Sequence, residues 1–372
     1  MSRRMFTGLA ATAAASLALA GPSALMGCRS ARGDEIFKGE RTIVDDWGRE
    51  LVIPTPERLE SVYFTSSLAQ VFVSTLAPDL MGARCTKFSE EDLRYLPEGI
   101  GDLRYLGSLS TNEMDVEAVM VTGVQLIFSI SAVGLTEANL SEAEDIENRS
   151  GIPVVLVDGS FERIDKAYAL IGSILGREER AAELSAYCEA AYAAVTSAVA
   201  DIPEEEKVAV YYAEGPLGLQ TEPDVSQHAL VFSVAGARNV AEVEHVEAAG
   251  MSNVSLESVM AWDPEVIIAW DAERRGGADH RIRTHEDWSV VGAVRTGRVY
   301  TMPNVPYSWV DRPPACNRFL GIQWIANMLY PDRYDVDMVE VTKEFYQLFY
   351  GVEITDDEAK GFLGTSYPPY RA

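Results

Sequence analysis

The sequence predicts an α/β protein made of two Rossmann-like lobes with parallel sheets, joined by a long rigid helix. Apolar runs of strand length alternate with amphipathic helical segments, which is typical of parallel sheets covered on both faces. One long segment without proline, from Phe161 to Ala200, separates two such blocks. A short helix that carries Glu and is followed by a strand occurs once in each block, at 116–128 and at 256–268.

Residues 1–27 are predicted to be a signal peptide. Arg3 and Arg4 precede an apolar run of small residues that is too short to remain as a membrane span. The sequence Leu25-Met26-Gly27-Cys28 resembles a bacterial lipobox, so we expect Cys28 to be acylated and to become the new N-terminus. Residues 28–40 then form a lipidated tether at the extracytoplasmic face of the cell membrane, after export by either the general or the twin-arginine route.

Composition narrows the range of functions. The formal net charge is −26, and the acidic residues are dispersed rather than clustered, which argues against a nucleic-acid ligand. With 47% hydrophobic residues the chain has enough apolar material for two domain cores. Cys85, Cys188 and Cys316 are expected to be buried thiols with at most one disulfide, because their number is odd and no C-x-x-C motif is present.

The N-terminal α/β lobe is expected over residues 41–160. It opens with a hairpin over 41–54 that turns at Asp46-Trp47-Gly48, and Thr65-Ser66-Ser67 provide N-cap chemistry for a helix that starts near Leu68. The other expected elements are strands at 59–64, 126–130 and 151–158 and a helix at 135–149.

The linking helix is expected over residues 161–203 and the C-terminal lobe over 204–372. The linker reads as one long helix or two nearly collinear ones, weakened locally by Gly172 and Gly176 and ended by Pro203. Strands are expected at 207–213, 266–270 and 298–302, and helix returns over 317–350 with an aromatic docking face formed by Phe345, Tyr346, Leu348, Phe349 and Tyr350.

Several segments, in order and spacing, resemble one class of ABC-importer substrate-binding proteins. They are the hairpin followed by 56–62, the two Glu-helix-strand units, and the segments 236–241 and 288–300. The class is the class III periplasmic binding proteins, which capture iron-siderophore complexes, haem and cobalamin. One departure is Thr122-Gly123-Val124-Gln125, where the class usually has Pro-Asp before the strand; the second unit keeps Asp263-Pro264.

The resemblance implies that Glu117 and Glu257 dock on the two halves of a membrane permease dimer. Two symmetric exposed carboxylates suit a two-fold partner. The alternative is that each Glu only places a negative charge in the first turn of its helix.

Ligand-binding residues are expected at the carboxyl ends of the parallel strands, in the cleft between the lobes. Each candidate group has a plainer alternative, namely ordinary N-capping, a solvated loop or a loop anchored on the core. The candidates are Tyr63, Thr65, Ser66 and Ser67 in the first lobe, and Tyr212, Trp270, Arg274, Arg275, Tyr307, Trp309 and Arg312 in the second.

The resemblance favours a chelated metal of the iron-siderophore type as ligand. A molybdate- or tungstate-like oxyanion is the next alternative, because Arg and Ser suit oxyanions, and cobalamin or haem is the third. No metal site is expected, since the four His residues form no compact ligand set. No enzyme motif is present, and a metallocluster-type enzyme would need more Cys ligands. We therefore expect a monomeric binding protein without a cofactor.

Overall fold

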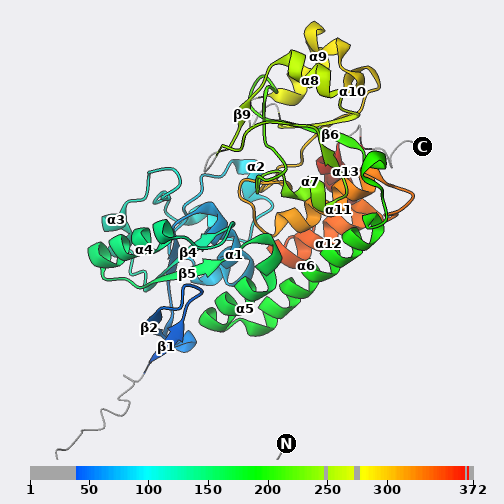
Figure 1. Cartoon of the computed structure of the whole chain (residues 1–372). Coiled ribbons are helices and arrows are strands. Elements are labelled where there is room, and N and C mark those ends of the chain that lie inside the picture. The colour runs from blue at the N-terminus through cyan, green and yellow to red at the C-terminus, as the bar shows by residue number, and fades with distance from the viewer. Residues whose placement is uncertain (1–38, 247–249, 272–276, 365–366, 368–372) are drawn as a thin grey trace, which may run out of the picture. The chain divides into compact units, whose positions relative to one another are not determined.

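The computed structural model describes residues 39–246, 250–271, 277–364 and 367, and it confirms the predicted α/β fold with two parallel sheets (Figure 1). The first sheet has the order β3-β4-β5 and the second the order β11-β10-β6-β8, and every pairing in both is parallel. The strands of the first sheet are β3 (Val62–Phe64), β4 (Leu126–Ser131) and β5 (Val154–Asp158). Those of the second are β6 (Ala209–Ala213), β8 (Arg238–Asn239), β10 (Val266–Ala269) and β11 (Val299–Thr301).

Helices cover the first sheet because its strands are apolar on both faces. The central residues of β4 and β5 are buried throughout, as parallel strands between helical layers require. The helices of this lobe are α1 (Ser67–Leu76), α2 (Glu90–Leu93), α3 (Val116–Met120) and α4 (Glu137–Ser150). The predicted start of α1 is confirmed, since the Ser66 hydroxyl accepts a hydrogen bond from the Ala69 amide at 3.3 Å.

The predicted N-terminal hairpin is formed by β1 (Glu40–Val44) and β2 (Glu50–Pro54), which pair antiparallel. The Asp45 carboxylate holds the turn by accepting bonds from the Trp47 and Arg49 amides at 3.1 and 2.9 Å. Arg49 reaches from the turn to Glu147 on α4, at 3.3 Å, so the hairpin is tied to the first lobe.

The linker differs from the expectation of one helix or two nearly collinear ones. It forms α5 (Ile164–Leu175) and the long α6 (Glu178–Val199), which fold back and pack on each other. Gly176 adopts a positive φ of 65° that ends α5, and an added Cβ on Gly172 would lie 2.5 Å from the Ala181 Cβ. The two glycines therefore mark a tight turn and a close helix contact, rather than weak points within a continuous helix.

The second lobe carries its helices around the sheet and against α6. They are α7 (Leu230–Val234), α8 (Leu256–Trp262), α9 (Ala278–Thr284), α10 (Gly292–Arg295), α11 (Asn317–Leu329), α12 (Met338–Tyr350) and α13 (Asp356–Leu363). A small antiparallel pair, β7 (Gln220–Thr221) with β9 (Ser252–Asn253), lies beside β6.

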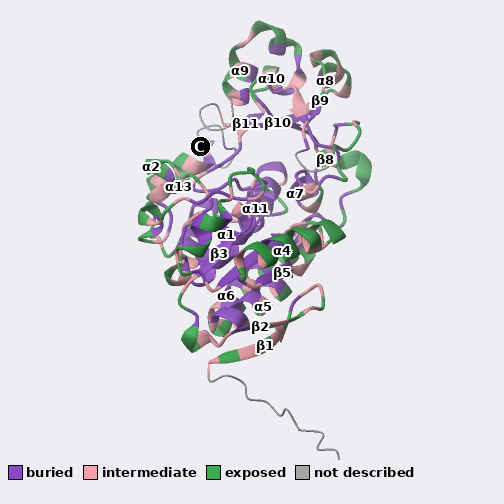
Figure 2. Ribbon diagram, turned by 90° about the vertical axis from the view of Figure 1, so that its left-hand side faces the viewer, coloured by how far each residue is buried: buried purple, intermediate pink, exposed green. Residues whose placement is uncertain are grey.

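The helical region expected over 317–350 is interrupted after Leu329, where Pro331 ends the pattern. Every residue of α11 is buried, and the helix contacts α6, α7 and α12 (Figure 2). In the predicted aromatic face, Phe345, Tyr346, Phe349 and Tyr350 are buried and Leu348 is half-buried.

Cys85, Cys188 and Cys316 are all buried free thiols. In the part of the chain that the structure describes, no helix has the length and apolar character needed to cross a membrane.

Candidate functional site

A cavity of about 360 Å³ lies where the start of α1 faces the loop that follows β11. The first lobe contributes Ser67, the segment 86–89 and Asp92, and the second contributes Asn304, Pro306, Tyr307, Arg312 and Pro313. Both sides follow the carboxyl ends of parallel strands, β3 and β11, so the cavity is where the open-sheet rule predicts a ligand.

Arg312 is the central charged residue of the second-lobe wall. Its Nη2 lies 3.2 Å from Glu214 Oε1 and 3.3 Å from Glu222 Oε1, and its Nε lies 3.0 Å from Asp311 Oδ2. The three carboxylates are fully buried, while the Arg312 side chain is 19% exposed. The guanidinium also lies 5.4 Å from the Trp270 ring centroid. Arg312 therefore neutralises the acids behind it and shows one edge to the cavity.

The protonation of Glu214 follows from this crowding. Burial raises the pKa of its carboxyl to about 9, with the neighbouring Asp311 charge adding to the rise and Arg312 opposing it. Glu214 therefore keeps its proton at neutral pH, and the group around Arg312 holds less negative charge than its three carboxyls suggest.

Tyr212 and Trp270 support this cluster from behind. Trp270 Nε1 donates to the Tyr212 hydroxyl at 2.8 Å, and that hydroxyl donates to Asp311 Oδ1 at 2.8 Å. Tyr212 is fully buried and Trp270 is 7% exposed. His228 Nδ1 lies 3.1 Å from Asp311 Oδ2. The two predicted aromatics thus position the charged loop rather than forming the surface of the cavity.

Sequence reasoning missed Glu214, Glu222, His228 and Asp311. Asp311 stands beside Arg312 in the loop of residues 306–314, and this position next to a predicted site residue is the signal that could have identified it. Nothing in the sequence marks the other three, because they come from separate segments that only the fold brings together.

Of the predicted first-lobe residues, only Ser67 lines the cavity. Tyr63 is buried in the core and donates to the Gly107 carbonyl at 2.5 Å. Thr65 is buried and donates to the Ser129 hydroxyl at 3.2 Å. Ser66 is the N-cap of α1, so the plainer alternative applies to it.

Tyr307 and Trp309, predicted together, occupy different environments. Tyr307 lines the cavity and meets Phe88 edge-on with ring centroids 5.8 Å apart. Its hydroxyl accepts a bond of 3.4 Å from Gln70 Nε2, which links the second-lobe loop to α1. Trp309 is wholly buried and packs on Trp324 in α11, so its role is in the core. Cys28, Arg274 and Arg275 lie outside the described residues.

Glu117 and Glu257 occupy the same position in two capped helices. Each is the second residue of its helix, α3 or α8, and each N-cap side chain, Asp115 or Ser255, accepts a bond from the amide three residues on. Both side chains are exposed, and Glu117 lies 3.7 Å from Arg149. Bonds from its own amide and from Ser255 lower the pKa of Glu257. Both carboxylates are therefore accessible to a partner.

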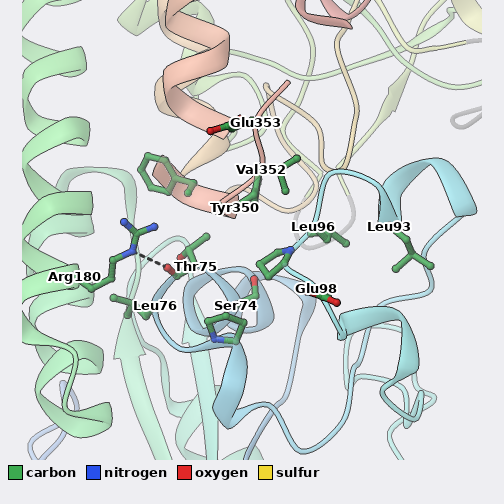
Figure 3. A pocket seen from close by; sticks show the side chains of 14 residues that line it. Ser74, Thr75, Leu76, Leu93, Leu96, Glu98, Arg180, Tyr350, Val352 and Glu353 are labelled. Atoms are coloured by element: carbon green, nitrogen blue, oxygen red, sulfur yellow. Dashed lines mark hydrogen bonds between the residues drawn. The ribbon is translucent and has the colours of Figure 1, made fainter. Parts of the chain in front are cut away.

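A larger cavity, of about 730 Å³, lies at the opposite end of α1 (Figure 3). Its Arg180 side chain donates to the carbonyls of Thr75 and Leu348, near the ends of α1 and α12. The cation is thus committed to helix ends, and the cavity does not adjoin the carboxyl end of a sheet. Among the described residues, no group of three or more His, Cys, Asp or Glu side chains is placed to hold a metal ion.

The sequence and the fold are similar to those of known proteins. A family model described as periplasmic binding protein matches residues 107–306. The molybdate-binding protein MolA of Haemophilus influenzae is 27% identical over 272 residues, covering 70% of this chain and 74% of MolA.

Two solved structures are similar along most of the chain. An ABC transporter solute-binding protein from Sulfurospirillum deleyianum aligns with a TM-score of 0.78 and 29% identity, covering 87% of this chain and 98% of that one. The molybdate-bound structure of Haemophilus influenzae MolA aligns with a TM-score of 0.69 and 22% identity, covering 85% and 99%. This second likeness is one of fold.

Proposed function

The chain belongs to the periplasmic binding protein family and is the extracytoplasmic substrate-binding component of an ABC importer, and we propose that its ligand is an oxyanion of the molybdate type. The observation that carries this proposal is that each lobe places a basic side chain on the wall of the inter-lobe cavity. Lys87 comes from the first lobe and Arg312 from the second, beside the first residue of α1. Helix amides and cations together are the usual means of holding an oxyanion.

The similarity to MolA adds to this argument. It extends over 70% of the chain, and the matched protein is named for binding molybdate. A cavity of about 360 Å³ is also of the size that small ligands occupy.

An iron-siderophore-type chelate is the second candidate. Phe88 from the first lobe and Tyr307 from the second both line the cavity and meet edge-on, and such aromatics can pack on the organic part of a chelate. The aromatic wall is small, so this observation favours a compact chelate over haem or cobalamin.

Delivery to the permease is proposed to use Glu117 and Glu257. Their equal positions in two capped helices offer one carboxylate on each lobe to a two-fold partner. Acylation of Cys28 would hold the protein near that partner and raise the effective concentration of the encounter.

The test is a thermal-shift series on the protein from residue 29 onward. A ligand at about 100 times its Kd stabilises the native state by about 2.7 kcal/mol. We expect molybdate and tungstate to raise Tm, while sulfate, ferric catecholates and haem give smaller shifts. A shift with a ferric chelate and none with molybdate or tungstate would refute the oxyanion proposal and favour the second candidate.

A further inference from the structure

We propose that Asn317 and Arg318, in the first turn of α11, form a buried anion-binding site that takes the charge of the oxyanion ligand. This inference rests on the proposed function and names residues that the sequence did not single out. Its starting point is that the two cations on the cavity walls are already paired. Arg312 contacts three carboxylates, and the exposed Lys87 lies 3.0 Å from Glu113.

Arg318 is a buried cation of a different kind. The residue is 1% exposed, and its Nε and Nη1 atoms have no hydrogen-bond partner. It forms no ion pair with any carboxylate in the described part of the chain. A guanidinium can only donate, so these atoms need acceptors. Leaving a buried charge without them is costly.

The acids that influence the Arg318 charge do not fill this role. Glu162 and Asp311 act on the Arg318 charge only from a distance, and burial is the dominant influence, lowering the Arg318 pKa to about 10. Asp311 is already held by Arg312, His228 and Tyr212. A water molecule could accept the N–H bonds but could not neutralise the charge.

Asn317 provides a second donor at the same helix turn. It is fully buried, and its Oδ1 accepts a bond of 2.8 Å from the Tyr350 hydroxyl. This bond orients the amide, and its buried Nδ2 has no hydrogen-bond partner. The turn has no side-chain cap and no acidic residue, so the positive end of the α11 dipole is not offset there.

Arg318, on a helix of the second lobe, contacts a ring that belongs to the end of the first lobe. The Arg318 guanidinium lies 4.8 Å from the ring centroid of Phe161, which follows β5 at the carboxyl end of the first sheet. Asp311, which acts on the Arg318 charge, belongs to the second-lobe cluster behind the cavity. An anion at this turn would therefore be held between a first-lobe ring and a second-lobe helix.

The test measures molybdate affinity and the Tm of the ligand-free protein in parallel. Arg318→Met removes the charge at similar volume, and we expect at least a 100-fold loss of affinity, because charged hydrogen bonds are lost, with no fall in the ligand-free Tm. Asn317→Asp keeps the acceptor for Tyr350 and places a carboxylate beside Arg318. This variant should raise the ligand-free Tm and abolish molybdate binding. Arg180→Met, outside the site, should lower the ligand-free Tm and keep the affinity.

The outcomes distinguish a failure of the Arg318 site from a failure of the proposed function. If wild-type protein binds molybdate and Arg318→Met binds it equally well with a lowered ligand-free Tm, Arg318 is a structural residue and the inference is overturned while the proposed function stands. If wild-type protein binds neither molybdate nor tungstate, the proposed function fails, and the inference fails with it. Retained binding by Asn317→Asp would also overturn the inference, and this variant serves if Arg318→Met does not fold.

Discussion

Replacing Glu214 by Gln should change how the stability of the protein depends on pH. Glu214 is fully buried against Arg312, and its pKa is raised to about 9 by burial and by Asp311. In the unfolded chain the same carboxyl titrates at about 4.3. Between these values the native state binds a proton that the unfolded state has lost, so this group makes stability fall as pH rises.

The magnitude follows from linkage. One proton of difference makes the free energy of unfolding fall by roughly 1 kcal/mol or slightly more per pH unit, so between pH 6 and 8 the wild-type protein should lose about 3 kcal/mol relative to Glu214→Gln. The Gln side chain imitates the protonated acid and carries no such slope.

The assay is urea unfolding of both proteins at pH 6, 7 and 8, compared through the difference in unfolding free energy at each pH. Glu142→Gln, at an exposed position on α4, controls for the exchange itself. Parallel profiles for wild type and Glu214→Gln would show that Glu214 is ionised in the native state at neutral pH, and the reasoning about the cluster would be wrong.

Three further predictions concern the cluster, the helix packing and the docking surface. Arg312→Gln leaves buried carboxylates without their cation and should cost about 3–5 kcal/mol in urea unfolding, and a cost below 1 kcal/mol would contradict the assigned pairing. Gly172→Leu forces a side chain into the α5–α6 contact and should lower the free energy of unfolding by about 1–3 kcal/mol. The control is Gly361→Ala, whose added Cβ meets no atom within 4 Å, and it should leave stability unchanged or raise it. Equal effects of the two variants would refute the close contact. The double variant Glu117→Lys with Glu257→Lys should abolish uptake by cells and keep the Kd of the purified protein, and persistent uptake would argue against docking through these residues.

Periodicity and turn chemistry were sufficient for most of the fold. Strands such as β4 and β5 are continuous apolar runs, and α1 begins at the Ser cap that the sequence offers. The turn between α5 and α6 was missed, because Gly176 in a helical pattern reads equally well as a tolerated weak point or as a C-cap. Only the packing of Gly172 on Ala181 distinguishes the two.

The site was predictable only where one loop carries it. Tyr307 and Arg312 do line the cavity, because they stand just after a strand that ends at the cleft. An aromatic side chain lines the cavity or packs in the core according to how deeply it is buried. That depth depends on the segment that packs against it in the fold. Trp309 therefore reads like Tyr307 in sequence, yet packs under α11.

The sequence does not distinguish arginines that pair with carboxylates in the fold from arginines that do not. Arg312 stands in a distinctive loop, but its guanidinium already contacts three carboxyl groups. Arg318 lies within an apolar helix and belongs to no sequence motif, although the structure leaves two of its donor atoms without acceptors. Whether a buried cation is paired depends on the side chains that the fold packs around it, and its own segment of sequence does not reveal these.

The central claim is most directly tested by isothermal titration of molybdate into the purified protein from residue 29 onward. Saturable binding of one molybdate per chain, lost in Arg318→Met and kept in Arg180→Met, is the result that the account predicts. Titration without heat for molybdate and tungstate, alongside saturable binding of a ferric chelate, would contradict it.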